Sequence, residues 1–190
     1  MNRVAFTGLS IKTALIGVGN VLFTDEGVGV YAVNYLAKNY TFDDSLTIID
    51  GGVLGFKLMG YFQEFDHVII LDTVSIEDEP GSVYRLPSDE LLGLGTYRKT
   101  AHEVEIVEML EICSMLESMA NVVIMGIIPK DIESVSSALT PEIKTGLGNF
   151  LDATLNELTS IGISYQKKND IKMDEIIENF FKEDALGFEI

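Results

Sequence analysis

The stretch TALIGVGNVLFTDEGVGVYAVNYLAKN, residues 13–39, decides the fold. Residues 13–18 are a short run of apolar and β-forming residues, which predicts a buried strand. Residues 27–39 then bring Val28, Val33 and Leu36 near one face of a helix. The glycines at positions 17 and 19 mark a tight turn out of the strand. A buried strand that leads into a helix in this way is typical of an α/β domain.

The same alternation of strand-like and helix-like segments continues along the chain. Further strands are expected at residues 46–50, 67–71, 81–86 and 121–128. Further helices are expected at residues 54–64, 102–119 and 140–158. Continuous apolar runs such as HVIIL indicate strands buried on both faces, as in a parallel sheet covered by helices. The order predicts a three-layer α/β/α fold with a mostly parallel sheet of about five strands.

One domain is expected over residues 1–165, because the chain has 190 residues and no internal repeat. Residues 1–12 read as a short extension or an incorrect start. Residues 166–190 form an acidic C-terminal extension, in which isoleucines and phenylalanines have the spacing of one amphipathic helix. That helix could dock on the domain, pair with a partner or stay mobile.

The composition narrows the classes of partner. There are 13 basic and 30 acidic residues, and the net charge is −17, so neither nucleic acid nor an anionic membrane is an expected partner. No apolar run reaches the length of about 18 residues that a membrane span needs. The single cysteine, Cys113, excludes an internal disulfide framework and fits a cytoplasmic location. A domain of this size is expected to act as a monomer.

Three polar side chains follow apolar segments at positions where α/β proteins keep their chemistry: Glu26, Asp72 and His102. Right-handed crossovers would bring the carboxyl ends of the parallel strands to one edge of the sheet. Two carboxylates and an imidazole there would suit a divalent transition metal. The alternatives are that Glu26 only favours a helix N-terminus and that His102 caps a helix. His67 begins a strand, so it belongs to the opposite edge.

Other kinds of site fit the sequence less well. The pair Gly17 and Gly19 suggests a dinucleotide fingerprint, but Leu22 occupies the place of the third glycine. The chain has no GxSxG nucleophile motif, and His102-Glu103 lacks the second histidine of a zinc-protease HExxH motif. Cys113 lies in the middle of an expected helix and reads as a core residue.

An ordered set of motifs resembles the hydrogenase maturation endopeptidases. The segments are GVGNVLFTDEGVGVYAV, IDGGVLGFKLMG, HVIILDTV, PGSVYRL, TAHE and GIIPKDIE, followed by LTPEI. The resemblance implies an aspartyl-type endopeptidase that removes the C-terminal extension of a [NiFe] hydrogenase large-subunit precursor after nickel insertion. Nickel would be supplied by the precursor. The family's metal-binding positions fall on Glu26, Asp72 and His102, and its DGG motif falls on residues 50–52.

Roles for these residues follow as hypotheses. Bridging of the nickel by the three side chains would align the scissile peptide, with Asp72 acting as a catalytic residue as well as a ligand. The nickel could also polarise the peptide carbonyl or activate water. Asp50 is a candidate base or peptide-orienting group. Two other functions stay open: a non-catalytic chaperone that binds metal or precursor on the same fold, and a nucleotide-binding enzyme.

Overall fold

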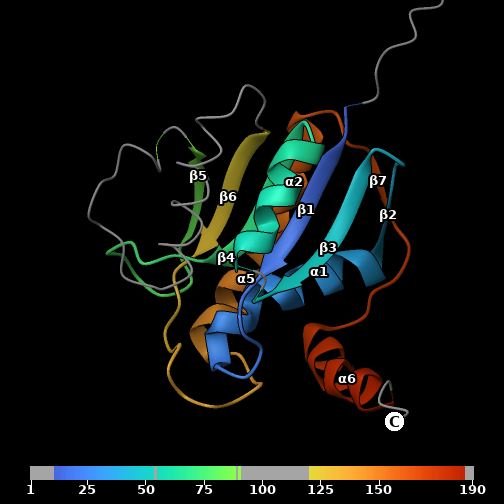
Figure 1. Ribbon diagram of the computed structural model, residues 1–190. Coiled ribbons are helices and arrows are strands. Elements are labelled where there is room, and N and C mark those ends of the chain that lie inside the picture. The colour runs from blue at the N-terminus through green and yellow to red at the C-terminus, as the bar shows by residue number, and fades with distance from the viewer. Residues whose placement is uncertain (1–10, 54, 89, 91–119, 187–190) are drawn as a thin grey trace, which may run out of the picture.

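The computed structural model describes residues 11–53, 55–88, 90 and 120–186 (Figure 1). Its central sheet contains β3 (Leu46–Gly52), β1 (Thr13–Val18), β4 (His67–Thr73), β6 (Asn121–Ile127) and β5 (Val83–Pro87), in that spatial order. The pairs β3–β1, β1–β4 and β4–β6 are parallel, and only β5 runs antiparallel to its neighbour β6. The predicted five-stranded, mostly parallel sheet is therefore confirmed.

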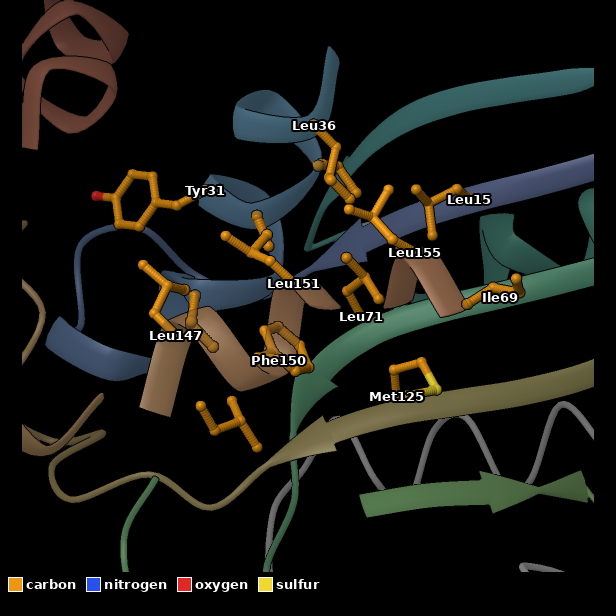
Figure 2. Close-up of a cluster of buried hydrophobic side chains, with 14 of the residues drawn as sticks. Leu15, Tyr31, Leu36, Ile69, Leu71, Met125, Leu147, Phe150, Leu151 and Leu155 are labelled. Atoms are coloured by element: carbon orange, nitrogen blue, oxygen red, sulfur yellow. The ribbon is translucent and has the colours of Figure 1, made fainter. Parts of the chain in front are cut away.

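Side chains alternate between the two faces of this sheet, because successive residues of a strand point to opposite sides. On one face, Leu15, Ile69 and Met125 pack against α1 (Val28–Asn39) and α5 (Pro141–Ser160) (Figure 2). On the other face, Ile16 and Ile70 pack towards η2 (Gly55–Leu58) and α2 (Met59–Glu64). Helices thus flank the sheet as expected for the three-layer arrangement.

The start of α5 follows the prediction from the sequence. Thr140 is the N-cap, and its side chain accepts a hydrogen bond from the backbone N–H of Ile143. Pro141 occupies the first turn, where its missing N–H costs no hydrogen bond. The helix expected at residues 102–119 lies outside the described residues.

A second, two-stranded sheet is a feature that the sequence did not predict. It pairs β2 (Tyr40–Phe42) with β7 (Tyr165–Lys167) in antiparallel register. Strands of three residues are too short to show a hydrophobic period. β7 spans the expected boundary between residues 165 and 166.

The acidic extension contains α6 (Met173–Leu186), which packs on α1 (Figure 1). Ile176 and Ile177 are buried in this contact. The entry to α6 is fixed by Asn39, whose side chain donates to the carbonyl of Ile171 and accepts from its N–H. Among the residues that the structure describes, no helix combines the length and apolar character needed to cross a bilayer.

Candidate active site

The carboxyl ends of β3, β1 and β4 meet at one edge of the sheet. Gly17 of β1 is in register with Asp50 of β3 on one side and with Leu71 of β4 on the other. Asp72 is therefore the next residue along β4 beyond this row. The chain after β1 crosses to the α1 face, whereas Val74, just after β4, packs in the cluster on the α2 face. Such divergence of neighbouring loops opens a crevice where α/β proteins bind ligands.

Asp72 is buried at this edge, with a relative exposure of 2%. Its Oδ1 accepts a hydrogen bond of 2.7 Å from the backbone N–H of Thr73. The strand that carries it is apolar and buried on both faces, so the main chain fixes the carboxylate in place. A buried carboxylate stays ionised only when hydrogen bonds or a cation compensate its charge. Asp72 thus has the position and environment expected of a ligand or a catalytic group.

Glu26 lies in the short 3-10 helix η1 (Thr24–Gly27), which contacts β4. The chain reaches this position through a tight turn at Gly19, whose φ of 136° is unfavourable for other residues. A Cβ at Gly19 would lie 1.8 Å from the carbonyl oxygen of Glu26. The glycine pattern that suggested a dinucleotide site therefore serves this turn. The positive φ values in this loop fall on Gly19 and Thr24.

Asp25, next to Glu26, is a buried residue to which the sequence assigned no role. Its carboxylate accepts hydrogen bonds from the backbone N–H groups of Lys130, Asp131 and Thr140, and from the Thr140 hydroxyl, at 2.8–3.0 Å. These bonds tie the loop after β1 to the loop between β6 and α5. No local sequence signal could identify it, because its partners, three backbone N–H groups and one hydroxyl, lie more than a hundred residues away.

Asp50 is exposed at the end of β3. Its Oδ2 accepts a hydrogen bond of 3.0 Å from Asn34 Nδ2, and its Oδ1 accepts one of 3.2 Å from the N–H of Gly52. A Cβ at Gly52 would meet nothing within 4 Å, so this glycine leaves open space beside Asp50. Gly51 differs, because a Cβ there would lie 2.8 Å from the carbonyl of Gly17 within the sheet. Of the two glycines of the DGG motif, only Gly52 faces open space.

The three predicted metal ligands are only partly covered by the structure. It brings η1, which carries Glu26, and the end of β4, which carries Asp72, to the same edge. His102 lies outside the described residues, so the three-ligand set stays a prediction. Within the described ranges, no group of three His, Cys, Asp or Glu residues could hold a metal ion. His67 begins β4 at the opposite edge, as expected.

A pocket of about 250 Å³ lies beside this edge. It is lined by residues 74–76, which follow β4, and by residues 128–132, which follow β6. Aliphatic side chains of Val74, Ile76 and Ile132 contribute to its wall, together with Asp131. Hydrogen bonds from Ser134 and Glu133 lower the pKa of Asp131, so its carboxylate is ionised. This edge of the sheet thus combines carboxylates with a pocket whose lining is partly apolar and partly polar.

Comparisons with known proteins agree with this arrangement. A family model described as hydrogenase maturation protease matches residues 30–157. The hydrogenase 2 maturation protease of Escherichia coli is 31% identical over 155 residues, which cover 80% of this chain and 94% of that protein. HupD of Bradyrhizobium diazoefficiens, a hydrogenase expression/formation protein, is 29% identical over 160 residues, which cover 83% of each chain.

A solved structure supports the same assignment. The hydrogenase maturating endopeptidase HybD from E. coli superposes with a TM-score of 0.76 at 29% identity, covering 83% of this chain and 98% of that chain. The family model covers more than half of the residues of this chain. The chain therefore belongs to the hydrogenase maturation protease family.

Proposed function

We propose that this chain is an endopeptidase that removes the C-terminal extension of a [NiFe] hydrogenase large-subunit precursor, and that it recognises nickel already held by the precursor. The observation that carries the proposal is the position of Asp72. This carboxylate is 2% exposed, ends β4, and lies at the sheet edge to which η1 brings Glu26. Membership of the maturation protease family supports the reaction class.

The donor chemistry fits a cation that the substrate brings. Carboxylate oxygens and an imidazole nitrogen from His102 would suit a divalent transition metal, and three donors leave positions for ligands from the precursor. An incomplete site of this kind would bind nickel weakly in the isolated protein. It would therefore respond to a precursor that carries nickel and ignore one that does not.

Asp50 is proposed to act on the peptide itself. Asn34 and the N–H of Gly52 orient its carboxylate, and the open space at Gly52 gives a substrate backbone access to it. In hydrolysis the oxygen of a water attacks the scissile carbonyl carbon, and its proton passes to a base before it reaches the departing amine. Asp50 and Asp72 are the two candidates for this base. Nickel held by the precursor would polarise the carbonyl during the attack.

The decisive experiment compares nickel-loaded with nickel-free precursor in the presence of the purified chain. Shortening of the loaded precursor alone, seen by mass spectrometry, is the expected result. Asp72→Asn and His102→Ala should abolish shortening while circular dichroism stays unchanged. The matched control is Asp152→Asn, an exposed carboxylate on α5, which should process precursor at the normal rate. Normal processing by Asp72→Asn would refute the assignment of the site.

The same experiment distinguishes the alternative function. A chaperone without catalytic activity would bind nickel-loaded precursor and leave its length unchanged. The proposal further includes a monomer that acts in the cytoplasm, without nucleic acid or membrane partners; the net charge of −17 supports the last two points. Gel filtration at the concentration used for cleavage tests the monomer.

A further inference from the structure

Tyr31 joins two loops at the candidate site although it lies in the core. It is fully buried in α1. Its hydroxyl lies 3.2 Å from the carbonyl oxygen of Val21 and 3.1 Å from that of Ser137. In Figure 2 the ring lies at the border of the apolar cluster, with the hydroxyl directed away from Leu147 and Leu151. One O–H group thus donates to both the loop after β1 and the loop before α5.

Helix α6 holds the ring of Tyr31 in this position. The Phe180 ring meets it edge to face, with ring centroids 5.8 Å apart and an interplanar angle of 89°. This geometry is favourable for aromatic pairs. Phe180 is placed by its own helix, since Ile177 is buried in the cluster that includes Tyr31 and the apolar residues of α5. All of α6 lies beyond residues 30–157, the part of the chain that the family model matches.

The loop that Tyr31 holds is the one that carries Glu26. In it, the Thr24 N–H donates to the carbonyl of Ser136, and the Thr24 hydroxyl donates to that of Ser134, both at 2.7 Å. Thr24 has a φ of 44°, a conformation that a non-glycine residue keeps only when its surroundings hold it there. The position of the Glu26 backbone therefore depends on the contacts between these two loops.

We propose that Phe180 and Tyr31 are positioning residues for Glu26, through which α6 supports the edge of the candidate site. The aromatic contact fixes the Tyr31 ring, and the Tyr31 hydroxyl then holds residues 20–27 against residues 134–138. The inference rests on the proposed function, because it gives Glu26 a role in cleavage. Burial raises the pKa of Tyr31 to about 12, so the hydroxyl remains a donor throughout the physiological range.

Two variants test the two contacts separately. Tyr31→Phe keeps the ring and removes the hydroxyl, and Phe180→Leu keeps an apolar side chain and removes the ring. The matched control is Lys144→Ala, which removes the exposed ion pair between Lys144 of α5 and Asp174 of α6 and leaves both Tyr31 and Phe180 in place. All three are compared with the unaltered chain at a temperature at which circular dichroism shows them folded.

The first measurement is hydrogen exchange of the backbone amides, which needs no substrate. Tyr31→Phe and Phe180→Leu should speed exchange in residues 20–27 and 134–138 by about fivefold, the factor for loss of one neutral hydrogen bond. The amides of α5 should be unaffected, which a general loss of stability would not allow. Lys144→Ala should change neither loop. Unchanged exchange in residues 20–27 of the two test variants would overturn the inference.

The second measurement is kcat/KM for nickel-loaded precursor. Tyr31→Phe and Phe180→Leu should each lower kcat/KM about fivefold. The double variant should lower it little more than Tyr31→Phe alone, because Phe180 acts through Tyr31. Normal kcat/KM in Tyr31→Phe would overturn the role in cleavage. If the unaltered chain leaves the precursor intact, the proposed function fails, and amide exchange alone decides whether α6 holds the loop.

Discussion

Asp25 and Asp50 lie at the same edge of the sheet, yet the chain encloses the first and leaves the second in contact with solvent. Asp25 accepts four hydrogen bonds from the loop between β6 and α5 and is not exposed at all. Asp50 accepts one hydrogen bond from Asn34 of α1 and one from Gly52 of its own strand, β3. The loop after β1 is thus a rigid support, and the turn after β3 is an accessible surface. Substitutions in the loop after β1 should therefore lower stability, and substitutions in the turn after β3 should mainly lower activity.

Asp25→Ala should have the largest effect on stability. It would leave the backbone N–H groups of Lys130, Asp131 and Thr140 without their acceptor, at a cost of about 4 kcal/mol in unfolding free energy. The matched truncation Asp50→Ala should change it by less than about 0.5 kcal/mol. Urea titrations measure both. Equal losses of unfolding free energy in Asp25→Ala and Asp50→Ala would contradict the distinction between the supporting loop after β1 and the accessible turn after β3.

Gly19→Ala should have the next largest effect and lower the unfolding free energy by about 3 kcal/mol or more. A Cβ at this position would lie 1.8 Å from the Glu26 carbonyl oxygen, and alanine is strained at a φ of 136°. Gly52→Ala is the comparison in the turn after β3. Gly52 has a φ of 46°, and a Cβ there would meet no atom within 4 Å. Gly52→Ala should therefore lower the unfolding free energy by only about 1 kcal/mol. Thermal unfolding of the two variants gives the order, and a reversed order would contradict the rigid-support description.

Alkaline pH should weaken the support at Tyr31. Burial raises the pKa of this tyrosine from 10.0 to about 12, so the folded state disfavours the phenolate that the unfolded chain forms readily. The stabilising effect is complete below pH 10 and is lost as the pH rises towards 12, by roughly 2–3 kcal/mol. Tyr31→Phe lacks this titration, so its unfolding free energy should fall less steeply above pH 10. Parallel pH profiles for the two proteins would exclude Tyr31 as the cause.

Asp50→Asn should have the smallest effect on stability and a clear one on activity. The amide keeps the shape of the carboxylate, so unfolding should shift by less than about 0.5 kcal/mol. Loss of the negative charge should nevertheless slow processing of nickel-loaded precursor if Asp50 takes a proton or orients the peptide. Single-turnover cleavage measures this. A normal rate would assign the base to another group.

The parts of the fold that the sequence predicts are those with a strong local pattern. β1, β4 and β6 are mainly apolar runs, and α5 begins with Thr140 and Pro141 at the positions that favour a helix start. The parallel order of the strands then brings Glu26 and Asp72 to one edge, because carboxyl ends of parallel strands meet there. Local pattern and connection rules together therefore predict which side chains lie at this edge.

The features that the sequence did not predict depend on contacts between distant residues. β2 and β7 have three residues each, and their pairing joins Tyr40 to Lys167. Asp25 looks like one acidic residue among many, because its donors belong to residues 130–140, more than a hundred positions away. The contact of Phe180 with Tyr31 likewise exists only once α6 has docked. The role of His102 remains a prediction.

The small sheet of β2 and β7 has a consequence for any shortened form of the chain. Cutting before Tyr165 would strip β2 of its partner strand and uncover the rings of Tyr40 and Phe42, which now pack with the ring of Tyr165. A bare strand edge flanked by aromatic rings is a template for self-association. We therefore expect a chain that ends before Tyr165 to aggregate more readily than the full chain.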